Sequence, residues 1–110
     1  MPQLLFRGVP TEQLLSVSEK LAVRLAAICE CGTDNFTMDC VQTVSIFGGQ
    51  KDGRSYPFVE VGWFERGTEV RNRFAEAVTQ SLQEIGIAES EVAFRTYRED
   101  SYYINGRPCV

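Results

Sequence analysis

The sequence predicts a single α+β domain over residues 1–110, in which two helices cover one face of a four-stranded sheet and a short hairpin follows. Three observations predict this fold. Two long stretches carry apolar residues at helical spacing, four runs with strand-like patterns give the order βαββαβ, and a late Asn105-Gly106 pair suits a tight turn. At 110 residues and 44% apolar composition, the chain is long enough to bury one core.

The first strand and the first helix are predicted from the N-terminal third of the chain. Leu4 and Phe6 alternate with the residues around them, and Gly8 closes this strand. A helix then opens at Pro10-Thr11 and is expected to end at Gly32. Its apolar stripe recurs at steps of three and four: Leu14, Val17, Leu21, Leu25 and Ile28.

Two more strands are predicted before the second helix. The run from Phe36 to Phe47 alternates apolar and polar residues and indicates a long second strand. A polar, glycine-rich connection over residues 48–53 follows. The third strand is expected from Phe58 to Phe64, with apolar residues on both faces, which is typical of a strand covered on both sides.

The second helix is predicted to have Thr68 as its N-cap and to end at Gly86. Its apolar stripe consists of Val70, Phe74, Ala77, Val78, Leu82 and Ile85. A fourth strand from Glu91 to Arg98 follows, and the Asn-Gly turn then predicts the terminal hairpin.

If each strand-helix-strand half is parallel, a right-handed crossover places both helices on the same face of the sheet. The other face then needs cover. Because Phe58, Gly62 and Phe64 make this side too apolar for water, we expect the chain to oligomerise through it with a hydrophobic interface.

Charge and composition exclude several classes of function. The net charge of −4 and the lack of a Lys/Arg block argue against a nucleic-acid partner. No run approaches the roughly 18 apolar residues of a membrane span, and no signal segment stands at the N-terminus, so we expect a cytoplasmic protein.

The four cysteines are expected to stay reduced in that compartment. Cys29, Cys31 and Cys40 offer at most three thiolates, and the chain has no histidine to complete a zinc site. We therefore expect neither a metal nor another cofactor, and we interpret Cys29 and Cys40 as small core residues.

The Met1-Pro2 start, followed directly by an apolar strand, is the main indication of chemistry. If Met1 is removed, Pro2 has a free secondary amine. An α-amino group has a pKa of about 7.7–8.0, and burial or a neighbouring cation lowers this pKa. Such an amine can act as a base without histidine. If Met1 is retained, Pro2 is a tertiary amide and the pair is an accident of the start site.

Taken together, these features resemble the tautomerase superfamily, which includes 4-oxalocrotonate tautomerase and macrophage migration inhibitory factor. The resemblance covers nearly the whole chain. It is carried by Met1-Pro2, the two βαβ halves, Phe47-Gly48-Gly49, and the stretches Tyr56–Arg66 and Tyr102–Gly106, which look closest to a small bacterial branch. The resemblance implies a homotrimer with a pocket at each subunit interface and the N-terminal proline at its floor.

The resemblance also implies roles for individual residues. Pro2 matches the catalytic proline, which acts as a general base in enol–keto isomerisation or, when protonated, as an acid. Arg66 is the first candidate for holding a substrate carboxylate, and Arg95 is the second. Each of these two arginines has an alternative interpretation. Arg66 could be a solvated residue at the end of a strand, and Arg95 could form an ion pair with an acidic residue of a neighbouring subunit, such as Glu60. Arg71 and Arg73 are second choices.

Five aromatic residues are candidates for lining the substrate pocket: Phe47, Trp63, Tyr97, Tyr102 and Tyr103. Aromatic residues in strands are alternatively part of the core. Two family positions are not matched, since Thr33 stands near the lysine and Ala93 at the tyrosine of the inhibitory-factor branch. The resemblance therefore does not support a phenylpyruvate or dopachrome activity.

The leading hypothesis is a tautomerase-like isomerase that acts on a small 2-oxo or dienol carboxylic acid, with free Pro2 as the base. The alternative is a non-catalytic binding or assembly module of ferredoxin-like or tautomerase fold, because fold does not dictate function. In that case Pro2 is incidental and the open sheet face only builds an assembly.

Overall fold

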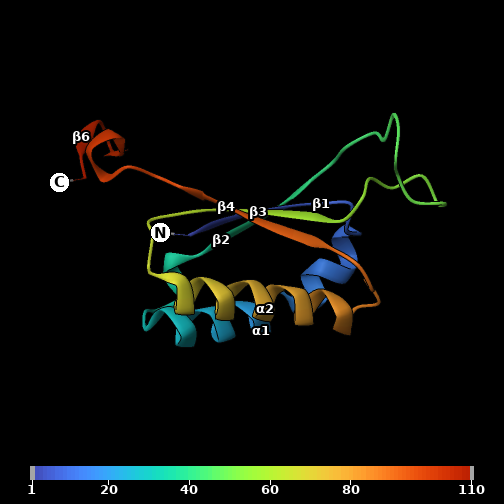
Figure 1. Ribbon diagram of the computed structural model, residues 1–110, viewed down its shortest axis with the longest axis horizontal. Helices are drawn as coiled ribbons and strands as arrows, with labels where there is room; N and C mark the ends of the chain where they lie inside the picture. Colours follow the sequence, from blue (N-terminus) through green and yellow to red (C-terminus); the bar gives the residue numbers. More distant parts are fainter. Residues whose placement is uncertain (1, 110) are drawn as a thin grey trace.

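The computed structural model describes residues 2–109. Two helices, α1 (Thr11–Cys29) and α2 (Thr68–Glu84), lie against one face of a four-stranded sheet (Figure 1). The strands are β1 (Gln3–Arg7), β2 (Thr37–Val41), β3 (Phe58–Trp63) and β4 (Glu91–Thr96). A separate hairpin of β5 (Tyr103–Ile104) and β6 (Arg107–Pro108) ends the fold. The predicted element order and the placement of both helices on one face are confirmed.

The sheet joins two parallel pairs through one antiparallel pair, in the strand order β2-β1-β3-β4. β1 is parallel to β2 and β3 is parallel to β4, and a helix makes the crossover in each half. β1 and β3 are antiparallel, with Gln3 opposite Gly62. The start of β1 therefore lies beside the end of β3.

The core lies between the sheet and the helices. Alternate strand residues, including Leu4, Phe6 and Trp63, are completely buried there, because successive side chains of a strand point to opposite faces. The two predicted helical stripes supply the other side of the core: Leu14, Val17, Leu21 and Leu25 of α1, and Phe74, Ala77, Val78 and Leu82 of α2. Each large apolar side chain buried in this way contributes about 1.5–3 kcal/mol.

The second strand is shorter than predicted, and the expectation that it reaches Phe47 is wrong. Its partner β1 ends at Arg7, which is paired with Val41, so the chain beyond Val41 has no strand to pair with. Residues 42–57 instead form a projecting loop, which we call the arm (Figure 1). Thr43 and Ser55 share a hydrogen bond of 2.6 Å across the base of the arm.

Gly8 explains why β1 ends where it does. Its φ is +75°, and a Cβ atom there would lie 2.3 Å from the carbonyl oxygen of Ser55. The returning side of the arm thus passes directly over the turn that follows β1. Any residue other than glycine at this position would meet both a strained backbone and a backbone clash.

Helix α1 also ends earlier than predicted, at Cys29 rather than near Gly32. Glu30 adopts the left-handed conformation (φ 55°, ψ 49°) in which a helix C-terminus commonly places glycine. The Cys31 N–H donates to the Ala26 carbonyl over 3.0 Å, and the Glu30 N–H donates to the Ala27 carbonyl over 3.4 Å. These two bonds form a Schellman motif, which fixes the backbone on both sides of Glu30.

The other boundaries differ from the predictions by one or two residues. Gly67 is the N-cap of α2, and Thr68 is the first helical residue. Gly86 follows α2 with a φ of +89°, as expected of a residue that stops a helix. The turn of the hairpin has positive φ at both Asn105 and Gly106, which confirms the tight two-residue turn.

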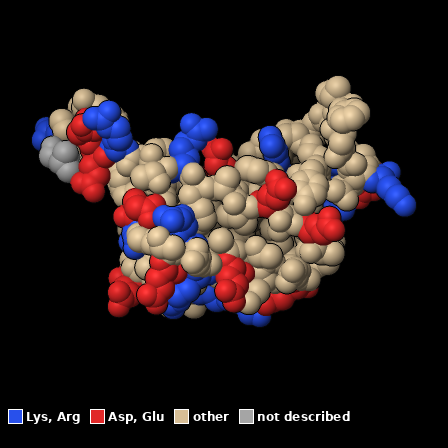
Figure 2. All heavy atoms as spheres, in the orientation of Figure 1, with Lys and Arg blue, Asp and Glu red and all other residues tan. Residues whose placement is uncertain are grey.

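The face of the sheet opposite the helices, which we call the open face, carries alternate strand residues. They are Gln3, Leu5, Arg7, Thr37, Asp39, Val41, Phe58, Glu60, Gly62, Glu91, Ala93 and Arg95. Acidic and basic side chains stand among the apolar ones, so this face is more polar than Phe58, Gly62 and Phe64 suggested. The arm and the hairpin project beyond it at opposite ends, and the surface between them is recessed (Figure 2).

Among residues 2–109, neither helix combines the length and the apolar character that crossing a membrane requires.

Candidate active site at the start of the first strand

Pro2 lies directly before β1 and is almost completely buried. Its carbonyl accepts a hydrogen bond of 3.3 Å from the Thr37 N–H, which continues the pairing of β1 with β2. Met1 lies outside the described residues, so its removal remains a prediction. The position nevertheless gives Pro2 the low-solvent surroundings in which an amine loses basicity.

Arg66 lies at the same end of the sheet as Pro2. Because β3 runs antiparallel to β1, the residues that follow Trp63 leave the sheet where β1 begins. Arg66 is exposed, and none of the ion pairs between residues 2 and 109 includes it. Its guanidinium is therefore available to an anion.

The charge of Arg66 acts on the Cys29 thiol at the end of α1. Burial raises the pKa of Cys29, and the positive charge of Arg66 acts in the opposite direction. The end of α1, the loop after β3 and the start of β1 thus meet in one region. Arg66 supplies positive charge to that region.

An aromatic cluster of Phe64, Tyr97 and Tyr102 covers the adjacent part of the open face. The ring centroids are 6.2 Å apart for Phe64 and Tyr97, 5.0 Å for Phe64 and Tyr102, and 5.4 Å for Tyr97 and Tyr102. Tyr97 lies over Gly62, where a Cβ atom would come within 2.0 Å of its hydroxyl. Gly62 therefore makes room for the cluster.

The Gln3 side-chain amide donates a hydrogen bond of 3.3 Å to the Tyr102 hydroxyl. This contact joins the aromatic cluster to the residue next to Pro2. Sequence reasoning missed Gln3 and Phe64 as site residues, whereas Tyr102 was among the aromatic residues considered for the pocket. The sequence could have indicated Gln3, because the alternation of side chains along β1 places it on the open face next to Pro2.

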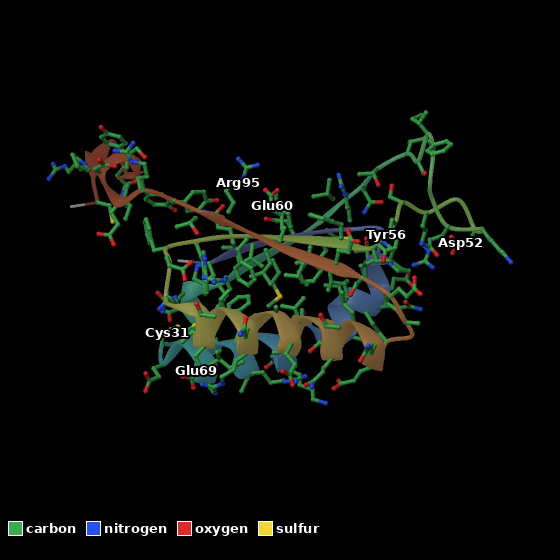
Figure 3. All side chains as sticks on the ribbon, in the orientation of Figure 1. Cys31, Asp52, Tyr56, Glu60, Glu69 and Arg95 are labelled. Carbon is green, nitrogen blue, oxygen red and sulfur yellow. The ribbon has the colours of Figure 1, made fainter. Side chains whose placement is uncertain are left out.

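Arg95 lies on the open face as predicted, but its charge is compensated within the same chain. Its Nε lies 3.3 Å from Oε1 of Glu60 on the neighbouring strand, and both side chains point away from the helices (Figure 3). The predicted alternative placed Glu60 in a neighbouring subunit. Since the partner within the chain already neutralises Arg95, Arg66 is the stronger candidate for binding a carboxylate.

The remaining predicted pocket residues are not brought together within one chain. Phe47 is 98% exposed on the arm, at the other end of the sheet from Pro2, and Tyr103 is exposed on the hairpin. Trp63 is completely buried on the helix side, with ring centroids 4.7 Å from Phe94 and 5.4 Å from Phe74. Trp63 is thus a core residue, because the alternation of β3 points it at the helices. Of the predicted pocket residues, Tyr97 and Tyr102 lie near the start of β1.

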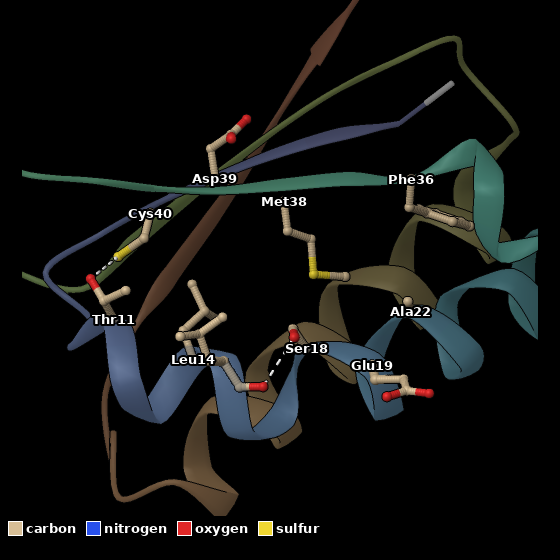
Figure 4. A pocket seen from close by; sticks show the side chains of 10 residues that line it. Thr11, Leu14, Ser18, Glu19, Ala22, Phe36, Met38, Asp39 and Cys40 are labelled. Atoms are coloured by element: carbon tan, nitrogen blue, oxygen red, sulfur yellow. Dashed lines mark hydrogen bonds between the residues drawn. The ribbon is translucent and has the colours of Figure 1, made fainter.

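A prominent cavity, of about 480 Å³, lies elsewhere, between α1 and the edge strand β2 (Figure 4). Leu14, Leu15, Phe36 and Met38 form its apolar wall. The Thr11 hydroxyl and the Cys40 sulfur meet at one end, 3.3 Å apart. Neither Pro2 nor Arg66 lines this cavity, so it does not belong to the candidate site.

Within residues 2–109, no three or more Cys, Asp or Glu side chains gather in a way that would hold a metal ion. The candidate site itself brings together Pro2, the Arg66 side chain and the aromatic cluster.

Replacing Arg66 with alanine is expected to raise the pKa of Cys29 further, because the substitution removes a cation that stabilises the thiolate. The measurement is the rate of iodoacetamide alkylation of Cys29 as a function of pH, followed by peptide mass mapping. The profile should move to higher pH in Arg66→Ala and stay near wild type in Arg66→Lys. Identical profiles in all three proteins would show that Arg66 does not lie near the end of α1.

Comparisons with known proteins agree with this fold. The family described as "Domain of unknown function (DUF1904)" matches residues 1–108. A DUF1904 structure from Sebaldella termitidis ATCC 33386 is 32% identical, covers 96% of this chain and 97% of its own, and has a TM-score of 0.83. A protein of unknown function from Vibrio cholerae is 27% identical, with 97% and 86% coverage and a TM-score of 0.85.

More distant structures extend the likeness to the tautomerase superfamily. A fused 4-OT, described as an asymmetric trimer, has a TM-score of 0.76 over 98% of this chain and 94% of its own, at 10% identity. At that identity the likeness shows the fold alone, and the fold is that of the tautomerases, as the sequence predicts. No curated protein matches the chain.

Proposed function

The chain belongs to the DUF1904 family and has the tautomerase fold, and on this premise we propose that it is a tautomerase-like enzyme. The observation that carries the proposal is the placement of Pro2, buried at the start of a central strand, at the same end of the sheet as the exposed Arg66, which forms no ion pair within residues 2–109. An amine beside a cation in poorly solvated surroundings has the features of a neutral-pH base.

The substrate class is a small 2-oxo or dienol carboxylic acid. Arg66 binds the carboxylate through two parallel hydrogen bonds, and its charge also stabilises the oxygen on which negative charge develops. After Met1 is removed, the Pro2 nitrogen accepts the proton of the enol hydroxyl and returns a proton to carbon. The aromatic cluster of Phe64, Tyr97 and Tyr102 excludes water from one side of the site.

The proposed assembly is a homotrimer built through the open face. The recessed surface between the arm and the hairpin is where a second copy of the chain would dock. The exposed Phe47 lies on the arm and the exposed Tyr103 lies on the hairpin. A fused 4-OT of the same fold is described as a trimer. In the assembly, Phe47 and Tyr103 would reach the Pro2 site of a neighbouring copy, which one chain does not provide.

We place the enzyme in the cytoplasm. All four cysteines are free in the described structure, which suits a compartment that keeps thiols reduced.

Titration of the N-terminal nitrogen by NMR, on protein whose intact mass shows that Met1 is absent, tests the proposal. The pKa of the Pro2 amine is expected to lie below the ordinary range of about 7.7–8.0, because burial and Arg66 both disfavour its charged form. Arg66→Ala should move this pKa upward. Arg95→Ala is the matched control and should change it less, since Glu60 compensates Arg95.

An ordinary pKa, or retention of Met1, would overturn the proposal. Either result would favour the non-catalytic binding or assembly module, for which the in-chain pairing of Arg95 with Glu60 already gives a structural role to one of the two arginines.

A further inference from the structure

Cys29 and Cys31 flank the left-handed residue that ends α1. Both thiols are free and half-buried, and the Schellman hydrogen bonds fix the backbone on either side of Glu30. Cys31 lies at the end of the helical layer (Figure 3). The two sulfur atoms are therefore carried by a short, well-defined segment rather than by a loose loop.

The backbone at Glu30 sets the spacing of the two cysteines. The distance between the Cα atoms on either side of a residue depends on the φ and ψ of that residue. The values at Glu30 (φ 55°, ψ 49°) are close to the mirror image of a right-handed helix, so the spacing is the same as in a helix. Helix geometry gives about 5.4 Å for two residues on either side of a third. This spacing lies inside the roughly 4.4–6.8 Å range that disulfides span.

The electrostatic surroundings of Cys29 agree with this spacing. Burial is the main cause of the raised pKa of Cys29, but the Cys31 thiol raises it as well and Arg66 lowers it. The two thiols therefore lie within the range of an electrostatic interaction, which is longer than the reach of a disulfide.

Cys40 is not a competing partner. Its sulfur lies 3.3 Å from the hydroxyl of Thr11, the first residue of α1, whereas Cys29 is the last residue of the same helix. A helix of 19 residues is about 28 Å long, which separates Cys40 from Cys29 by far more than a disulfide spans.

We propose that Cys29 and Cys31 are a redox-active dithiol that closes into an intrachain disulfide when the protein meets a low-molecular-weight disulfide. The Cys31 thiolate attacks one sulfur of the small disulfide, forms a mixed disulfide and releases one small thiolate. The Cys29 thiolate then attacks the Cys31 sulfur and expels the second small thiolate. The two protein thiols are oxidised, the small disulfide is reduced to two thiols, and the protein loses two protons.

The order of the two attacks follows from the raised pKa of Cys29. Because burial favours the protonated form of Cys29, the first attack falls to Cys31, and Cys29 acts as the resolving thiol. In the mixed disulfide, the second attack is intramolecular, so the fixed spacing at Glu30 speeds closure.

The experiment is incubation of the purified full chain with oxidised glutathione, followed by alkylation and intact mass measurement. Formation of the disulfide lowers the mass by about 2 Da and leaves two fewer alkylated thiols. Chymotrypsin cleavage after Leu25 and Phe36 separates the pair from Cys40 and locates the bond. Dithiothreitol should restore both thiols.

Two variants keep the test sharp. Cys31→Ser should form no intrachain disulfide, whereas Cys109→Ser, which removes an exposed thiol on the hairpin, should form it as wild type does. Circular dichroism checks that both variants are folded. Full alkylation of Cys29 and Cys31 in oxidised wild type, a stable mixed disulfide, or a bond to Cys40 or Cys109 would each overturn the proposal.

The dithiol goes beyond the proposed function and is tested without it. If mass measurement shows the disulfide while the Pro2 amine titrates normally, the catalytic proposal fails and the dithiol stands. If the pKa of the Pro2 amine is low and no disulfide forms, the dithiol proposal fails and the catalytic proposal stands.

Discussion

Replacing Pro2 with alanine in the Met1-trimmed protein is expected to lower kcat/KM by about 10²–10⁴-fold, the usual contribution of a positioned general base. Alanine keeps an amine but loses the ring that fixes the direction of the nitrogen lone pair. The measurement is the ultraviolet absorbance change as phenylenolpyruvate or 2-hydroxymuconate is converted. The intact masses of both proteins must first show that Met1 is absent.

The oligomer serves as the internal control for this substitution. Light scattering is expected to give the mass of three chains for both wild type and Pro2→Ala, because Pro2 lies on the core side of β1 rather than on the open face. Equal kcat/KM in the two proteins, with an unchanged assembly, would remove Pro2 from the mechanism. Loss of the assembly together with activity would instead assign Pro2 a structural role.

Replacing Trp63 with alanine is expected to lower the free energy of unfolding by about 3–5 kcal/mol, the range found when a large buried aromatic residue is truncated. Trp63 is completely buried and contacts Phe74 and Phe94, so its removal leaves a cavity under the sheet. Urea unfolding at one fixed protein concentration measures the change, since assembly makes stability depend on concentration.

Val23 of α1 provides the matched control, because its side chain is 57% exposed. Val23→Ala should change the free energy of unfolding by no more than about 0.5 kcal/mol. A loss below about 1 kcal/mol in Trp63→Ala would contradict the core position of Trp63 and revive its interpretation as a pocket residue.

The arrangement of helices and strands could be predicted from the sequence because it depends on local periodicity. The stripe from Leu14 to Ile28 and the alternation in β3 each need only one stretch of chain. The end of β2 could not be predicted, because Val44, Ile46 and Phe47 continue the alternating pattern. What stops the strand is the length of its partner, and that length is set by the turn at Gly8.

The candidate site could be predicted only in part, for a similar reason. Pro2 and Arg66 stand out as residue types, and the antiparallel register of β1 and β3 then brings them to one end. The pairing of Arg95 with Glu60 and the contact of Gln3 with Tyr102 depend on register between strands that are distant in sequence. The end of α1 was missed because a glutamate adopts the conformation that usually indicates glycine.

The hydrogen bond between Gln3 and Tyr102 has a consequence for the order of events during synthesis. It joins residues 99 positions apart, so the surroundings of Pro2 are complete only when nearly the whole chain has left the ribosome. A ribosome adds about 5–20 residues per second, which leaves the N-terminus accessible for several seconds. The proposed removal of Met1 therefore takes place on an open chain, and the finished fold then encloses the amine that processing has exposed.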